Sequence, residues 1–241
     1  MSISFSDTVN NTGILQQARK LMRVDSSQWP TVNVVNSCNN WLDFVAGYAI
    51  GADKRFQWDD TNHTKLPIGT TNLVANQSDY SFLTDEQSNN IVTLTRIDLL
   101  DSNGNYSQLE AIDQADLDGW GLDELQETTG TPMYYDKIAD NIIRLYPKPS
   151  TSVTAGLKFY FQRTPSYFTA SDTTKAPGVS PLLHRGFVIA AAYDGALTLA
   201  LNNLQPLAVE RDREIQRVKE YFGTRSNDER KQLTMSPISF R

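Results

Sequence analysis

Few residues in this sequence could support catalysis. Its 241 residues include two histidines, His63 and His184, which lie 121 positions apart, and one cysteine, Cys38. His63 falls in a polar loop, and His184 opens a helical pattern, where we expect it to cap the helix or to contact another subunit. Cys38 lies on an apolar helical stripe, which predicts a small buried hydrophobic residue. Since a metal site or a histidine-dependent triad needs more such groups, we expect no catalytic residue, no metal and no cofactor.

Acidic residues form the most distinctive charge pattern. Between Arg96 and Lys137 the chain carries no Lys or Arg and ten acids: Asp98, Asp101, Glu110, Asp113, Asp116, Asp118, Asp123, Glu124, Glu127 and Asp136. One interpretation is a face that simply contacts solvent. The other is a wall that lines a passage for nucleic acid, because acids repel phosphates and avoid the binding that lysines cause. Calcium binding would need an alternating Asp-x-Asp-x-Asp-Gly spacing, which the stretch lacks.

Overall composition argues against several classes of protein. The net charge of −6 and the pI of about 5.0 predict no general attraction to nucleic acid or to an anionic membrane. One cysteine excludes an intramolecular disulfide, and no secretory signal pattern is present, so we expect synthesis in a reducing compartment. The most apolar stretch, Gly186 to Leu201, contains Asp194 and is shorter than the roughly 20 residues that span a bilayer.

Helical periodicity occurs at both ends of the chain. Ser6 or Asp7 can cap a first helix, weakened by Gly13, and Thr31 can cap a second. The apolar stripes of these helices are Ile14, Ala18, Leu21 and Met22, then Val35, Cys38, Leu42, Val45 and Ala49.

A third helix is predicted after Pro181 and a fourth after Pro206. The apolar face of the third comprises Leu182, Gly186, Ile189, Tyr193, Leu197, Leu201 and Leu204, beside a stripe of small residues that includes Gly195. Small residues let another helix approach closely, so we expect this helix to be central. On the fourth, Glu210 with Arg213 and Glu214 with Arg217 are expected to pair on the solvent side.

Residues 66 to 168 instead show short β-like runs between turn signals. Ile142 to Tyr146 and Leu157 to Phe161 are predicted as two antiparallel strands that flank a proline-rich connection. Tyr134 to Ile138 is expected to pair with the first of them. The Asn103-Gly104 turn predicts a hairpin that joins Ile91 to Leu100 with Tyr106 to Ile112.

These patterns predict an α+β fold. The N-terminal and C-terminal helices would form a four-helix bundle with an inserted antiparallel β-sandwich or barrel. The expected segments are residues 1–65 and 171–223 for the bundle, 66–170 for the β region and 224–241 for an extended tail.

The order of elements resembles the head-to-tail adaptor proteins of tailed bacteriophages. The matching features are Ala18-Arg19 and Asp25, Asn39 or Asn40 near Trp41, Gln77, Tyr80, Gly130-x-Pro132, Leu145-Tyr146-Pro147-x-Pro149, Tyr160 to Pro165, and Pro177-Gly178 followed by His184. They extend over nearly the whole chain, and they are packing and turn residues rather than chemical groups.

The resemblance implies a structural virion protein made in the host bacterial cytoplasm, not an enzyme. Such adaptors assemble on the portal protein as a ring, usually dodecameric, which extends the DNA channel and offers a platform for tail and neck proteins. DNA would pass without specific binding, and no membrane is involved. The expected portal-docking tail residues are Met235, Pro237, Ile238, Phe240 and Arg241, and the candidate channel-facing acids are Asp113, Asp116, Asp118, Asp123, Glu124 and Glu127.

A second interpretation is a carbohydrate- or receptor-binding β module of a phage particle. The strand-rich middle of the chain and tyrosines that we expect to be exposed, such as Tyr106, Tyr134 and Tyr135, favour it. Helices on both sides of the β region argue against a free-standing lectin.

Overall fold

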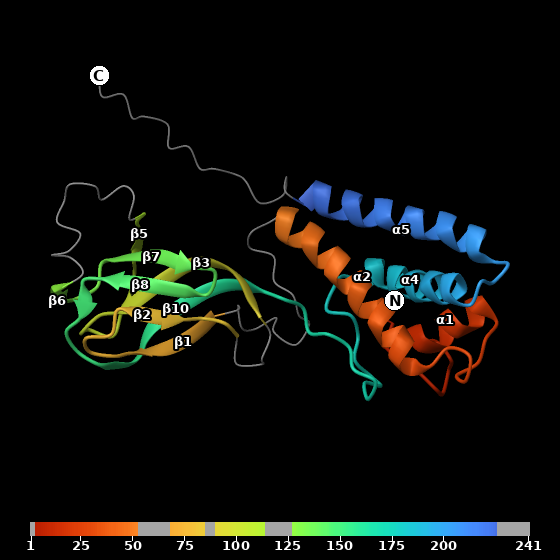
Figure 1. The fold of residues 1–241 in the computed structure, drawn as a ribbon, viewed down its shortest axis with the longest axis horizontal. Coiled ribbons are helices and arrows are strands. Elements are labelled where there is room, and N and C mark those ends of the chain that lie inside the picture. Colours follow the sequence, from red (N-terminus) through yellow and green to blue (C-terminus); the bar gives the residue numbers. More distant parts are fainter. Residues whose placement is uncertain (1–2, 53–67, 85–89, 114–126, 226–241) are drawn as a thin grey trace, which may run out of the picture. The chain divides into compact units, whose positions relative to one another are not determined.

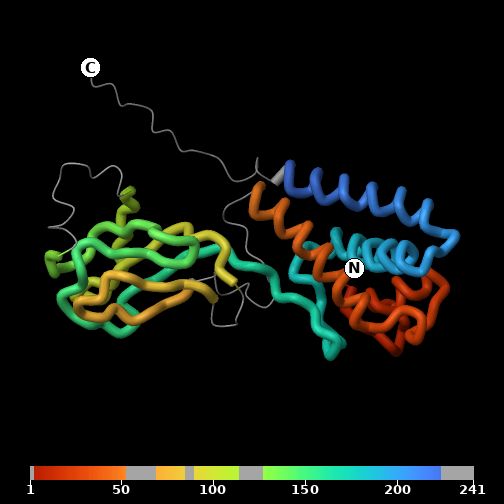
Figure 2. Tube along the Cα trace, viewed as in Figure 1, coloured from red at the N-terminus to blue at the C-terminus, as the bar shows by residue number. Residues whose placement is uncertain are grey.

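The computed structural model of this chain describes residues 3–52, 68–84, 90–113 and 127–225, and its fold is α+β, as predicted. The chain divides into two units, one formed by residues 1–56 and 167–241 and the other by residues 57–166. Figures 1 and 2 show that the red and blue ends of the chain share the first unit, here called the helical unit. The yellow and green middle forms the second, here called the strand unit.

The helical unit contains α1 (Ile14–Met22), α2 (Thr31–Ala52), the 3-10 turn η3 (Pro181–Leu183), α4 (His184–Thr198) and α5 (Leu204–Arg225). Helix α4 packs against each of α1, α2 and α5, which confirms that it is the central helix (Figure 1). No helix in the described part of the chain is long and apolar enough to cross a membrane.

Two glycines of α4 allow the close helix packing that the sequence predicted. A Cβ atom at Gly186 would lie 2.8 Å from the Trp41 ring of α2, and one at Gly195 would overlap the Met22 side chain of α1. The predicted apolar face was wrong at its ends, because Leu182 is 68% exposed in η3 and Leu197 is 55% exposed in the last turn of α4. Burial surrounds most of α4, so no single stripe describes it.

The first helix begins later than Ser6 or Asp7. Helix α1 starts after Gly13, and the preceding segment is not helical: it turns at residues 8–10, and its Phe5 amide donates to the Lys175 carbonyl at 2.7 Å. Phe5 is fully buried and stacks on Phe168. Gly13 is required rather than merely tolerated, since a Cβ there would lie 2.4 Å from the Asp7 backbone nitrogen.

The strand unit contains two four-stranded sheets and one two-stranded sheet. One sheet has the order β1 (Ile68–Leu73), β10 (Val153–Arg163), β3 (Ile91–Leu100), β4 (Tyr106–Gln108). The second has the order β2 (Asp79–Ser81), β8 (Ile142–Tyr146), β7 (Tyr134–Ala139), β5 (Glu110–Ala111). The third pairs β6 (Thr129–Gly130) with β9 (Lys148–Pro149). Side chains from both larger sheets, including Ile97, Phe159, Ile143 and Leu145, share one hydrophobic core.

The strands predicted on either side of the proline-rich connection exist, but they do not pair with each other. β8 lies between β2 and β7, whereas β10 lies between β1 and β3. The antiparallel pairing of β7 with β8 and the β3–β4 hairpin around Gly104, whose φ is +83°, confirm the other two pairings. That hairpin ends at Gln108, because Glu110 and Ala111 pair in parallel with β7 in the other sheet.

Candidate functional site

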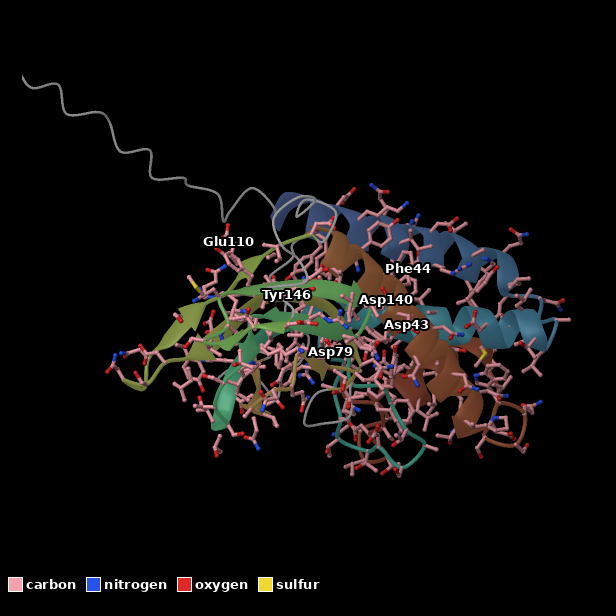
Figure 3. All side chains as sticks on the ribbon, turned by 60° about the vertical axis from the view of Figure 1, so that its left-hand side comes forward. Asp43, Phe44, Asp79, Glu110, Asp140 and Tyr146 are labelled. Carbon is pink, nitrogen blue, oxygen red and sulfur yellow. The ribbon has the colours of Figure 1, made fainter. Side chains whose placement is uncertain are left out.

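The acidic segment predicted to face a channel is described only at its two ends. Asp113 and Glu127 are both exposed, whereas Asp116, Asp118, Asp123 and Glu124 lie outside the described residues. Glu110, three residues before Asp113, is also exposed and is labelled on the strand unit in Figure 3. The described ends of this segment therefore present carboxylates to solvent.

Two other acids of the same stretch have structural roles. Asp98 is only 1% exposed and lies 2.5 Å from the Nε of Arg96. Asp101 accepts hydrogen bonds from the Asn103 and Asn105 amides, each at 2.8 Å, and so holds the β3–β4 turn. The stretch is thus not one uniform face, since Asp98 is buried on the side of β3 opposite to the core residues Ile97 and Leu99.

Charge is divided unequally between the two units. The residues of the helical unit include 15 Lys and Arg against 12 Asp and Glu, a net charge of +3. Those of the strand unit include 7 against 16, a net charge of −9. The total of −6 conceals this difference, because the two ends of the chain join in one unit. The strand unit is therefore the acidic part of the sequence, whereas the described residues of the helical unit, 3–52 and 167–225, carry 10 Lys and Arg against 9 Asp and Glu, a net charge of +1.

The tyrosines expected to be exposed are half-buried. The Tyr106 hydroxyl donates to the Ala155 carbonyl at 2.8 Å, and the Lys158 ammonium lies 4.9 Å from the centre of its ring. Lys158 also lies 5.4 Å from the ring centre of Tyr160. These rings stack with the protein's own cations, which leaves them less available to a sugar ring.

A groove of about 1040 Å³ lies in the helical unit, between the N-terminal segment, α1 and α4. Its lining includes three cations, Lys20, Arg23 and Arg185, together with apolar Leu21 and Ile189. The sequence analysis missed this groove, because its walls come from segments more than 150 residues apart.

The one acid in the groove lining is fully engaged by its own loop. The Asp7 carboxylate accepts hydrogen bonds from the Val9 and Asn10 amides and from the Thr12 hydroxyl. These bonds, led by that from the Asn10 amide, lower the pKa of Asp7 to about 2. Arg185 lies 3.0 Å from Glu210 of α5. Lys20 and Arg23 have no ion-pair partner among the residues that the structure describes, so they give the groove its available positive charge.

Glu214 does not lie on the solvent side of α5, as predicted, but is 3% exposed. The predicted pair with Arg217 forms at 2.8 Å, and Arg185 of α4 approaches to 3.7 Å. A buried carboxylate needs such partners. The contact of Arg185 with Glu214 therefore links α4 to α5, whereas the Glu214–Arg217 pair lies within α5.

His184 and Cys38 have structural positions. His184 is buried; its Nδ1 accepts a hydrogen bond from the Ile3 amide at 2.9 Å, and its Nε2 donates to the Val179 carbonyl at 3.0 Å. Burial lowers the pKa of His184 and raises the pKa of the Cys38 thiol. His184 thus fastens the N-terminal segment to α4, and Cys38 is a buried hydrophobic residue, as predicted.

The other functional residues predicted from the sequence lie outside the part of the chain that the structure describes. His63 and the tail residues Met235, Pro237, Ile238, Phe240 and Arg241 lie outside the described residues. Within the described ranges, no three His, Cys, Asp or Glu side chains form a group that could hold a metal ion.

Several residues of the phage-adaptor resemblance make polar contacts that fix loops. The Asn39 side chain exchanges two hydrogen bonds with the backbone of Phe168, at 2.8 and 3.0 Å. Arg19 donates to the Trp29 carbonyl, and the Tyr80 hydroxyl bridges the backbone of Val74. In the same helical unit, the Tyr167 hydroxyl donates to Asp43, which is labelled on α2 in Figure 3. The shared features thus stabilise the fold.

Comparison with known proteins gives one family. A family model described as SU10 adaptor protein matches residues 12–239, which include most of both units. No curated protein matches the sequence.

Proposed function

Because this chain belongs to the SU10 adaptor protein family, we propose that it is a structural virion protein of a tailed bacteriophage. In this proposal it is the head-to-tail adaptor: it docks on the portal protein, extends the DNA channel and provides the platform to which tail and neck proteins attach. The copies form a ring, with one copy per portal subunit and so a dodecamer on a twelve-fold portal. The helical unit serves as a four-helix bundle that carries the strand unit as an antiparallel sandwich or barrel.

The observation that carries this proposal is the extent of the family match. It runs from residue 12 in the N-terminal segment to residue 239 and takes in both units. His184 is buried and makes two hydrogen bonds, and Cys38 is buried as well. These positions fit a structural role better than a catalytic one.

The division of charge supports a role for the strand unit at the channel. DNA that moves through a ring must not bind to the wall, and a net charge of −9 repels phosphates. The exposed carboxylates of Asp113 and Glu127 border the acidic segment. In this proposal that segment, with Asp116, Asp118, Asp123 and Glu124, faces the passing DNA.

The C-terminal segment is proposed to bind the portal. Residues 226–232 are polar and of mixed charge, whereas residues 233–241 include Met235, Pro237, Ile238 and Phe240. A polar linker followed by an apolar segment can order when it docks, and one such contact from each copy adds avidity around a ring.

Native mass spectrometry of the protein mixed with its portal tests the proposal. We expect a complex with one copy per portal subunit, and we expect it to be lost when Thr234 to Arg241 are deleted. Circular dichroism should show that the truncated monomer remains folded. A full-length protein that stays monomeric beside the portal would contradict the adaptor role, and unchanged binding after truncation would contradict the tail's part in it.

A further inference from the structure

We propose that the groove of the helical unit receives the β7–β8 hairpin of a second copy of this chain. This inference rests on the proposed ring, since it names the surfaces through which neighbouring copies touch. Because the groove and the hairpin belong to different units, the contact would be heterologous and would repeat from copy to copy.

The groove has room for a hairpin turn, and both polar and apolar groups line it. Its volume is about 1040 Å³, at the upper end of the range for small-molecule sites. Leu21 on its wall is 42% exposed. Lys20 precedes Leu21 on α1, and Arg23 is the first residue after the helix. Both side chains are exposed. A complementary segment would therefore present an apolar residue close to one or two acids.

The cation at position 23 stands in a backbone conformation that favours glycine or asparagine. Arg23 ends α1 with φ of +61°, in the left-handed region, where a side chain other than these two costs about 1 kcal/mol. A cation near a helix C-terminus recovers part of that cost. Arg23 thus provides positive charge at the groove although its backbone conformation is strained.

The tip of the β7–β8 hairpin has the complementary composition. Ile138 is 38% exposed, and Asp140 in the turn is also exposed and is labelled in Figure 3. Asp136, on the same hairpin, is half-buried opposite Arg144, which pairs with Asp79. Residues 136–140 contain one cation, Lys137, and have a net charge of −1. Ile138 would contact Leu21, while Asp136 and Asp140 would approach Lys20 and Arg23.

The charge of the whole units favours the same pairing. A strand unit of net charge −9 repels another strand unit, whereas the exposed Lys20 and Arg23 of a neighbouring helical unit attract it. Asp136 and Asp140 are not among the six acids proposed to face the channel. One strand unit can therefore face the channel with those six acids and contact a neighbouring copy through its hairpin.

Disulfide trapping tests the contact in the full-length protein. Leu21→Cys protein is mixed with Ile138→Cys protein in a glutathione redox buffer, and the mixed disulfide dimer is quantified by mass spectrometry. The native Cys38 does not interfere, because it is buried with a raised pKa. Matched controls pair Ile138→Cys with Val209→Cys on α5, and Leu21→Cys with Met133→Cys at the end of the β7–β8 hairpin away from its turn, both at exposed apolar positions.

We expect the Leu21–Ile138 disulfide to form at least about tenfold faster than either control, in line with effective concentrations inside a complex. The rate should fall toward that of the controls at high ionic strength and when Lys20→Glu and Arg23→Glu are added. Adding Asp136→Lys and Asp140→Lys to the partner should restore it.

Equal rates for all three cysteine pairs would overturn the inference. So would a fast Leu21–Ile138 reaction that ignores the charge substitutions, since contact between copies would then not depend on the groove cations. Neither result involves the portal. Failure of the proposed adaptor function would instead appear as absence of portal binding by the unmodified protein.

Discussion

The two units of this molecule differ in net charge, although each buries charged side chains. The helical unit buries Glu214 beside Arg217, and the strand unit buries Asp98 beside Arg96. The strand unit has an apolar core and excess acid, with a net charge of −9. A buried pair contributes to a unique arrangement of helices, whereas an unpaired surface charge acts on what approaches it. The units therefore differ in what they repel, since the excess acid of the strand unit repels other polyanions.

The largest expected effect tests whether the two units are energetically separate. Ile97 is fully buried in the core of the strand unit, so Ile97→Ala should lower the free energy of unfolding of that unit by about 3 kcal/mol. Val92→Ala on the same strand, at a side chain 44% exposed, should change it by less than about 0.5 kcal/mol. Hydrogen exchange read by mass spectrometry reports the two units separately. Equal loss of protection in α4 would show that they unfold together.

A smaller effect tests the close packing of the central helix. Gly186→Ala places a methyl group 2.8 Å from the Trp41 ring, which is rigid, and should destabilise the helical unit by about 2 kcal/mol. Gly47→Ala in α2 is the matched control, because nothing lies within 4 Å of its added Cβ. That variant should stabilise by about 0.5 to 1 kcal/mol. Urea unfolding followed by circular dichroism measures both, and similar midpoints for the two variants would refute close packing at Gly186.

A third effect is a dependence of the stability of the helical unit on pH. Burial holds the pKa of His184 below its ordinary value of 6.5, so the unfolded chain binds a proton more readily than the folded one. The stability that neutral His184 contributes should therefore be present above about pH 6.5 and be lost as pH falls through the lower folded pKa. Thermal unfolding of the wild type and of His184→Gln, measured between about pH 7.5 and 5 where histidine titrates, should show a shallower pH dependence of stability in the variant. Parallel curves would contradict this role.

Local patterns predicted much of the fold, but they did not predict long-range partners. The helical stripe containing Cys38 and Leu42, and the hairpin around Gly104, follow from neighbours within a few residues. β8 and β10 lie in different sheets because β8 pairs with β7 and β10 pairs with β1. These pairings use backbone groups that a β8–β10 pairing would need. Local spacing carries no information about such competition.

The candidate surfaces were predicted only in part for the same reason. The run of acids is visible in the sequence, yet only the structure shows that Asp98 is buried while Asp113 and Glu127 are exposed. The basic groove depends on α1 and α4 meeting across more than 150 residues. Likewise, the contact of His184 with Ile3 joins residues 181 positions apart. A helical period signals that a residue is buried, but it does not identify its partner.

Cryo-electron microscopy of the protein bound to its portal would test the central claim most directly. The account predicts a ring with one copy per portal subunit, in which the carboxylates of Asp113 and Glu127 face the central channel. A complete ring with these residues on its outer rim would contradict the proposed role of the strand unit.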